Sequence, residues 1–378
     1  MSGILRIAYR LLVNDRGKFA ALLIGITFAV LLMIMMTSIY AGVMSRASAT
    51  IINTGASMWV MDRGVTSVVS SVPLPDYVLD AVRSVPGVKY AVPMFTGNGL
   101  VKLPDGDYQA VSIVGLDDST LFGRPRMLAG RIEDVYADNG FIVVKDAEYS
   151  KLRSPGVGTQ FELNDHRAVI VGIAQVASGS LFGIPTLYTT YSRATQDLPS
   201  TRFTLSYVLV EPKSRSDVPA IEAAVDALGY RALTRDRFIA RTAEFYKYQT
   251  GLGVNLLLMT LISFIVGMSI SGQTFYTFIL ENLEKFGALK AIGARSSELI
   301  GMILFQAAFT GLTGYGLGVG LSALLIAMAK LRLPTYAAMI TFGNLGVAFI
   351  MVLIITTVAS YIGVRRVLRI EPFDVFRG

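Results

Sequence analysis

The stretch Phe19–Met44, FAALLIGITFAVLLMIMMTSIYAGVM, contains no Asp, Glu, Lys or Arg. Three more charge-free stretches follow along the chain, at Leu252–Leu280, Leu299–Ala329 and Ile340–Val364. A helix needs about 20 apolar residues to cross the roughly 30 Å hydrocarbon core of a bilayer. Each of the four stretches is long enough, so we predict a membrane protein with four transmembrane α-helices.

The overall composition agrees with a membrane protein. Of the 378 residues, 53% are hydrophobic and only 16% are charged, with a mean hydropathy of +0.54. A soluble globular protein carries roughly 25% charged residues. The composition excludes a soluble enzyme and a disordered chain, and the lack of cysteine excludes a disulfide scaffold.

The first charge-free stretch has some features of a signal peptide. Four basic residues precede it, and the small residues Ala47–Ala49 follow it. Its apolar run, however, is far longer than the roughly 7–15 residues of a signal-peptide core. We therefore interpret Phe19–Met44 as a membrane span.

Lysine and arginine near the membrane ends predict the orientation, because cytoplasmic loops carry an excess of them. Residues 1–18 hold four, the loop 281–298 three and the tail 365–378 four, whereas the connection after the third span holds two. This predicts an inner-membrane protein whose termini and 281–298 loop are cytoplasmic. Residues 45–251 then form a large periplasmic or extracellular domain. Its 21 basic and 21 acidic residues leave no basic surplus, which excludes a nucleic-acid partner.

Segment 45–251 has the patterns of a folded α+β domain inserted between the first two spans. Two hairpins are predicted, around Pro104-Asp105-Gly106 and Asn164-Asp165-His166, because turn residues separate strand-like runs there. The other expected elements are helices at Asp76–Ser84, Asp146–Leu152 and Ser216–Leu228 and strands at Phe141–Lys145 and Thr204–Glu211. No proline lies between Asp236 and Leu280, so we expect one helix to continue from the domain into the second span. A break near Gly251–Gly253 would contradict this.

The predicted spans lack ionisable side chains. Asn255, Gln273 and Gln306 are their most polar residues. Coupling to a proton or sodium gradient is not expected, because ion-coupled transporters need ionisable groups within the membrane. We expect each of the three amides to make an interhelical hydrogen bond rather than bind a substrate.

The sequence also lacks the motifs of an enzyme. It has neither the Gly-x-x-x-x-Gly-Lys-Ser/Thr phosphate loop nor a Gly-x-Ser-x-Gly elbow. The single histidine, His166, is expected at a hairpin tip, and without cysteine most transition-metal sites are hard to build. Asp117 and Asp118 could hold a metal, but a solvated turn fits their context better. We predict a chain that is not an enzyme, binds no metal and leaves ATP to another polypeptide.

Small residues recur at four-residue intervals in two spans. The second span has Ser263, Gly267 and Ser271, and the third has the pairs Gly314–Gly318 and Gly316–Gly320. This spacing lets helix backbones approach closely. For the second span, a dimer interface and packing within one subunit both remain open, whereas internal packing is favoured for the third.

Two amphipathic segments are expected at the cytoplasmic side. Residues 1–18 carry an apolar stripe and should lie on the inner leaflet as a helix; the stripe is Ile4, Leu5, Ala8, Leu11 and Leu12. In 281–298, apolar residues recur at helical spacing up to Gly293, at Leu283, Phe286, Leu289 and Ile292. Such an edge must lie on membrane lipids or enter a groove in a partner protein. The candidate coupling residues are Glu281, Glu284, Lys285, Phe286, Leu289, Lys290, Ile292, Gly293 and Arg295.

Glu284–Arg295, EKFGALKAIGAR, resembles the signature motif of the FtsX/MacB-type ABC transporter permeases in its Gly-x-Leu-Lys-Ala-Ile-Gly-Ala portion. In that family the motif follows the second transmembrane helix, as it does here. The ending Ile370–Arg377 is similar to the family's Pro-x-x-x-[Leu/Phe]-Arg tail, and Val85–Val88 and Gly158–Phe161 fit its extracytoplasmic domain. Within the family, Thr189–Ala194 and the ending are most similar to DevC-type permeases.

The resemblance implies a mechanism. Two permeases form a homodimer and work with two subunits of a cytoplasmic ABC ATPase, which binds ATP and Mg²⁺, while this chain binds no cofactor. In DevC-type systems the ATPase is a separate chain, and a periplasmic membrane-fusion protein and an outer-membrane channel complete the assembly. Closure of the ATPase pair would push on Glu281–Arg295, and the spans would relay this motion to the external domain, a mechanism called mechanotransmission.

The expected function is that of a non-catalytic permease subunit of an ABC exporter for an amphipathic or hydrophobic substrate. One alternative is an FtsX-like signalling or scaffold protein that activates an extracytoplasmic partner such as a cell-wall hydrolase. Another is a lipoprotein-releasing permease. If the exporter interpretation is correct, Leu289→Asp or Gly293→Pro should abolish ATPase stimulation without unfolding the external domain.

Overall fold

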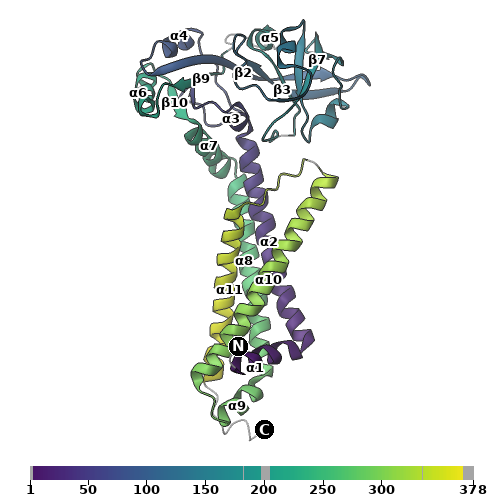
Figure 1. The fold of residues 1–378 in the computed structure, drawn as a ribbon, viewed down its shortest axis with the longest axis vertical. Helices are drawn as coiled ribbons and strands as arrows, with labels where there is room; N and C mark the ends of the chain where they lie inside the picture. The colour runs from purple at the N-terminus through teal and green to yellow at the C-terminus, as the bar shows by residue number, and fades with distance from the viewer. Residues whose placement is uncertain (1–2, 182, 197–204, 334, 369–378) are drawn as a thin grey trace. The chain divides into compact units, whose positions relative to one another are not determined.

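The computed structural model describes residues 3–181, 183–196, 205–333 and 335–368. The chain divides into two compact units (Figure 1). Residues 1–42 and 253–378 make up a helical bundle, which we call the membrane unit. Residues 43–252 make up a mixed α/β domain, which we call the inserted domain because it follows the first long helix and precedes the second.

The membrane unit is built from long apolar helices. Its helices are α1 (Gly3–Asn14), α2 (Arg16–Ala47), α8 (Leu252–Glu281), α9 (Leu283–Ala291), α10 (Ser296–Arg332) and α11 (Phe342–Leu368). In the described part of the chain, four of these, α2, α8, α10 and α11, are long and apolar enough to cross a membrane. The prediction of four transmembrane helices is confirmed.

Glycines allow the helices of this bundle to pack closely. A Cβ atom added at Gly314 or Gly318 of α10 would lie within 3 Å of Ile26 or Val30 of α2, respectively. At Gly316 and Gly320 it would meet nothing within 4 Å. The first pair of the third span therefore packs inside the subunit, as expected, and the second pair faces outward.

The inserted domain contains ten strands in one continuous sheet, in the part of the chain that the structure describes. The strands are β1 (Met58–Met61), β2 (Val88–Lys102), β3 (Tyr108–Leu116), β4 (Arg126–Ala129), β5 (Gly140–Val144), β6 (Gln160–Leu163), β7 (His166–Gln175), β8 (Thr186–Thr190), β9 (Tyr207–Pro212) and β10 (Arg231–Thr234). Their order is β10-β1-β9-β2-β3-β8-β5-β7-β4, and β6 pairs with β2 and β7. The β3–β8 and β5–β7 pairs are parallel and the others antiparallel.

Helices cover this sheet and connect its strands. They are α3 (Ala49–Thr54), α4 (Tyr77–Arg83), α5 (Tyr191–Gln196), α6 (Val218–Ala227) and α7 (Arg235–Glu244). Short 3₁₀ turns lie at Ile132–Tyr136, Tyr149–Leu152 and Arg215–Asp217, and a π-helical turn lies at Phe245–Gln249. The long strand β2 (Figure 1) pairs with β9 through its first half and with β3 through its second. One strand thus joins the two halves of the sheet.

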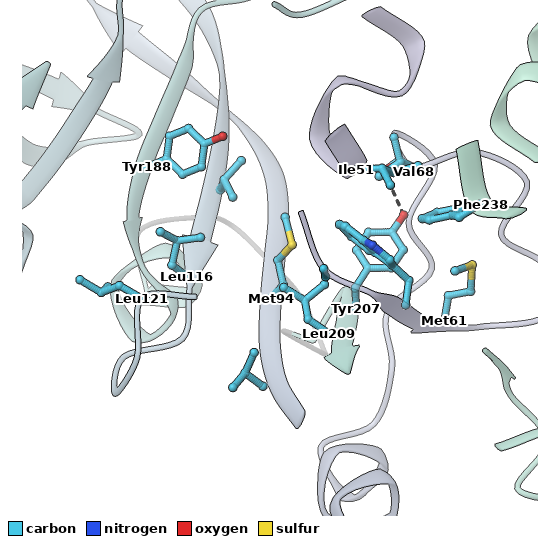
Figure 2. Packing of buried hydrophobic residues seen from close by; sticks show 14 of the residues in the cluster. Ile51, Met61, Val68, Met94, Leu116, Leu121, Tyr188, Tyr207, Leu209 and Phe238 are labelled. Carbon is cyan, nitrogen blue, oxygen red and sulfur yellow. Dashed lines mark hydrogen bonds between the residues drawn. The ribbon is translucent and has the colours of Figure 1, made fainter. Parts of the chain in front are cut away.

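The main core of the domain lies where α3 and α7 meet the sheet. Trp59 is fully buried there beside Tyr207 and Phe238, with ring centroids 5.3 and 5.6 Å from that of the indole. The Tyr207 hydroxyl donates a hydrogen bond of 2.9 Å to the Val68 carbonyl (Figure 2). Burial and aromatic packing of this kind dominate the stability of a small domain.

Most elements predicted for this domain are found. The two hairpins are β2–β3 and β6–β7, and Asn164 and Asp165 adopt φ values of 47° and 66° in the tight turn of the second. The predicted 216–228 helix is α6, with Ile221 and Val225 buried. Thr204 of the predicted strand 204–211 and the motif Ile370–Arg377 lie outside the described residues.

The prediction of one helix from Asp236 to Leu280 is wrong. Helix α7 ends at Glu244 and leads into the π-helical turn, and α8 begins only at Leu252. Gly251 lies between them with a φ of +74°, a left-handed conformation that interrupts a right-handed helix. The absence of proline was insufficient evidence, because glycine can also end a helix.

Candidate functional site

The candidate site is α9, the short helix between the second and third spans. It is joined to α8 at Asn282, which is 2% exposed. The Asn282 amide donates 2.8 Å to the Phe278 carbonyl, and its oxygen accepts 2.8 Å from Lys285 Nζ. These bonds fix the angle between the two helices.

At its other end, α9 terminates at Gly293. Gly293 has a φ of +103°, and the Ala294 N–H donates 3.0 Å to the Leu289 carbonyl, the pattern of a glycine-dependent helix end. The Arg295 N–H then donates 2.8 Å to the Glu298 carboxylate in the first turn of α10. A carboxylate there is favourable, because helix N-termini carry a partial positive charge. The motif Glu284–Arg295 thus covers most of α9, the glycine that ends it and the residue that caps the start of α10.

The inner side of α9 is anchored in the membrane unit. Phe286 is 0% exposed, and Leu283 and Leu289 are partly buried beside it. They pack on the base cluster, which consists of Ala8, Leu12, Leu22, Phe275, Phe278, Ile279, Phe286, Leu299, Met302, Ile303, Ala307, Ala359 and Val367. Most of the apolar edge is therefore covered by the chain's own helices rather than left for lipid or a partner.

The outer side of α9 is open. Of the four edge residues, Ile292 alone is exposed, at 84%. Glu284, Lys285 and Arg295 are also exposed, and Lys290 is half-buried. The outer side of α9 therefore presents one exposed apolar side chain among charged ones.

Helices α1 and α2 contact the other helices of the membrane unit near α9. Gln306 Nε2 of α10 donates 2.9 Å to the Ala8 carbonyl of α1, which confirms the interhelical bond expected for Gln306. Lys18 Nζ lies 2.5 Å from the Glu281 carboxylate and 2.8 Å from that of Asp15. The Lys18 ammonium holds the pKa of the Asp15 carboxyl below its ordinary value. The stripe of α1 is thus partly used within the protein, with Ala8 and Leu12 buried.

The small residues of the second span are buried within this subunit. Ser263, Gly267 and Ser271 are among the buried residues of α8. A Cβ atom at Gly267 would overlap Ala29 of α2, and the Ser263 hydroxyl donates 2.7 Å to the Met259 carbonyl. The structure thus buries this stripe within a single chain, with Gly267 against α2.

The acidic pair and the histidine of the inserted domain lie at turns between strands and helices. Asp117 accepts hydrogen bonds from the Ser119 hydroxyl (2.7 Å) and the Thr120 N–H (2.9 Å), as a turn residue does. His166 is exposed at its hairpin tip. Within the described ranges, no group of three or more His, Cys, Asp or Glu residues is placed to hold a metal ion.

Asn282, Lys18 and Glu298 belong to the site but were not predicted from the sequence. Asn282 lies inside the motif region yet has no periodic pattern to mark it. Lys18 is distant in sequence, and its contact with Glu281 depends on how α2 packs on α8. The Glu298 signal was present, since Glu three residues after a helix start is a capping residue.

Comparison with known proteins identifies the family. Residues 19–228 match the MacB-like periplasmic core domain, and residues 257–372 match the FtsX-like permease C-terminal domain. The chain belongs to the FtsX/MacB-type ABC transporter permeases. Together the two matches account for the inserted domain and most of the membrane unit, so this is a multi-pass membrane protein of that family.

Individual relatives are distant. The macrolide export ATP-binding/permease protein MacB of Salmonella typhimurium is 27% identical over 136 residues, 36% of this chain and 21% of that protein. HrtB of Staphylococcus haemolyticus, described as a hemin transport system permease, is 23% identical over 140 residues, 37% of this chain and 38% of that protein. The matched region therefore spans less than half the length of either relative.

Two solved structures are similar to part of the chain. The extracellular domain of the noncanonic ABC-type transporter YknZ from Gram-positive bacteria gives a TM-score of 0.37 at 12% identity, over 47% of this chain and 98% of that one. The periplasmic region of MacB from Actinobacillus actinomycetemcomitans gives a TM-score of 0.38 at 14% identity, over 51% and 94%.

Proposed function

We propose that this chain is the permease subunit of an ABC-type exporter and that α9 receives the motion of a separate ATPase. The proposal rests on the difference between the two sides of α9, one of which is buried in the protein and the other exposed. Phe286 is fully buried in the base cluster, while Ile292 is 84% exposed. Because packed interiors transmit displacement with little compression, a push on the outer side would move the helices that hold the inner side.

The route of the motion follows the connections of α9. Asn282 fixes α9 to α8, and the Gly293–Glu298 segment fixes it to α10. Lys18 links the end of α8 to the start of α2, and α2 continues to Ala47 in the inserted domain. We therefore expect displacement of α9 to reach the inserted domain through α2.

The remaining parts of the assembly follow from the charge distribution and the family. The basic residues around α1, α9 and the tail favour a cytoplasmic location for this end of the bundle. The ATPase would bind ATP and Mg²⁺ there, and this chain would carry out no catalysis. Two permease copies, a membrane-fusion protein and an outer-membrane channel would complete a DevC-type system. The substrate class we expect, in keeping with the resemblance to exporters of this family, is amphipathic or hydrophobic.

A signalling or scaffold role is the second candidate, because residues 257–372 match the FtsX-like permease domain. In that case the inserted domain would activate an extracytoplasmic partner such as a hydrolase. Co-purification distinguishes the two: a membrane-fusion protein supports export, and a hydrolase supports signalling.

The coupling role is tested by substituting the exposed apolar residue. Ile292→Asp should lower permease-stimulated ATPase activity at limiting ATPase concentration by about tenfold or more, because a charge would replace an interface anchor. Leu331→Asp is the matched control, since Leu331 is 83% exposed at the far end of α10. Leu289→Asp is less informative, because Leu289 is partly buried against the base cluster. Equal stimulation by the Ile292 and Leu331 variants would contradict the proposal.

A further inference from the structure

An apolar groove lies between α2 and α10 in the membrane unit. It has a volume of about 730 Å³ and is lined by residues between Ala20 and Leu31 of α2 and between Gly316 and Leu324 of α10. These two segments contain no charged residue. The volume falls within the roughly 300–1,000 Å³ that is usual for the binding site of a small molecule. The groove is therefore large enough for an apolar ligand.

Two glycines widen this groove. Gly316 and Gly320 line it, and a Cβ atom added at either would meet nothing within 4 Å. At Gly314 and Gly318 of the same helix, an added Cβ atom would overlap α2. One glycine pair of α10 thus allows contact with α2, and the other leaves open a space that no side chain from the described residues fills.

The groove has the length of one lipid chain. The residues of α2 that line it extend from Ala20 to Leu31, which is about 16 Å at 1.5 Å per residue. The hydrocarbon core of a bilayer is about 30 Å thick, so each leaflet contributes roughly half of that. An acyl chain that lies along α2 from the start of the groove would therefore fill it.

A basic residue precedes the groove on the same face of α2. Arg16 is the first residue of the helix, is exposed, and lies one turn before Ala20. The next basic residue, Lys18, already pairs with Asp15 and Glu281. Arg16 makes no hydrogen bond or ion pair with the part of the chain that the structure describes. A guanidinium group in this position can bind a phosphate through two parallel hydrogen bonds.

We propose that the groove holds one acyl chain of an anionic phospholipid and that Arg16 binds the phosphate of its head group. Arg16 and Ala20 are about 6 Å apart along the helix, so the phosphate and the start of the chain can be bound together. Residues 1–18 carry four basic side chains and one acidic side chain, which favours a head group with a net negative charge. This inference does not depend on the role proposed for α9.

Fluorescence quenching by brominated lipids tests the proposal in the full chain reconstituted into bilayers. Leu317→Trp places a tryptophan in the groove, and Leu353→Trp, on the exposed side of α11, is the control; the two leucines are 52% and 46% exposed. The single native tryptophan, Trp59, is fully buried in the inserted domain. At position 317, brominated phosphatidylglycerol should bind about fivefold more tightly than brominated phosphatidylcholine, the factor that one basic residue near an anionic lipid contributes. At position 353 the two lipids should bind equally.

Two further variants of Leu317→Trp test the groups that hold the lipid. Arg16→Gln should remove the preference for phosphatidylglycerol, whereas Arg365→Gln, which removes an exposed charge from α11, should retain it. Gly316→Leu should also remove the preference, because the new side chain would fill the groove without overlapping the chain's own atoms. Gly272→Leu is its matched control, since a Cβ atom there also meets nothing within 4 Å but lies on α8.

The contrary outcomes are specific. Equal binding of the two lipids at position 317, the same preference at position 353, or a preference that survives Arg16→Gln would overturn the proposal. Protection of position 317 from both brominated lipids would also overturn it, because a second copy of the chain or another protein would then cover the groove.

Discussion

Asp146 is a carboxylate of the inserted domain held in an unfavourable environment. Its Oδ1 accepts 2.9 Å from the Glu148 N–H, but its Oδ2 is buried without a hydrogen-bond partner. Burial raises the pKa of Asp146, and the nearby Glu148 charge raises it further. Glu148 itself is 1% exposed and forms an ion pair of 2.8 Å with Lys151. The protonated form of Asp146 is thus favoured by folding.

This predicts a specific pH dependence of stability. The native state binds the Asp146 proton more tightly than the unfolded chain, so this contribution is complete below the unfolded-state pKa and is lost as pH rises through the higher native pKa. Relative to the wild type, Asp146→Asn should therefore gain stability as the pH rises above the unfolded-state pKa of about 4. Fluorescence of the single tryptophan, the buried Trp59, reports unfolding of this domain. With exposed Asp138→Asn as the charge-loss control, a pH-independent difference between Asp146→Asn and the wild type would refute this prediction.

At the scale of the element, Gly267 determines how closely α8 approaches α2. A Cβ atom there would overlap Ala29, whereas one at Gly272 of the same helix would meet nothing within 4 Å. Gly267→Val should therefore destabilise the membrane unit by about 1–3 kcal/mol through overpacking. Gly272→Val should have a much smaller effect. Thermal unfolding of the full chain in detergent measures both, and equal destabilisation would show that the α2–α8 contact is not tight.

The elements that could be predicted from sequence are those with a regular pattern. Charge-free stretches predicted the long helices, and turn residues predicted both hairpins. Strands β1 and β8 were missed, because Met58–Met61 is buried on every residue and Thr186–Thr190 on nearly every one, so neither shows the alternation of a half-exposed strand. The spacing of α9 predicted a helix ending at Gly293. Which side of α9 is free depends on distant residues such as Ala8 and Leu12, which the local pattern cannot reveal.

For the whole molecule, the break at Gly251 changes the path by which we expect motion of α9 to reach the inserted domain. Helix α8 does not continue into the inserted domain, whereas α2 runs from Arg16 to Ala47 and crosses the boundary between the two units. The two places where the chain passes between the units therefore differ. At the first, α2 is a continuous helix, and at the second, the helical path is interrupted at Gly251. Our proposal is therefore that α9 receives the motion of the ATPase and that α2 transmits it.

The most direct test measures whether ATP moves the inserted domains through α9. A spin label on Tyr108→Cys, an exposed position (64%) in a chain without cysteine, gives the distance between two copies in the reconstituted complex. We predict that ATP binding changes this distance in the otherwise wild-type permease and that Ile292→Asp removes the change. An unchanged distance during active ATP hydrolysis, or the same change with Ile292→Asp, would contradict it.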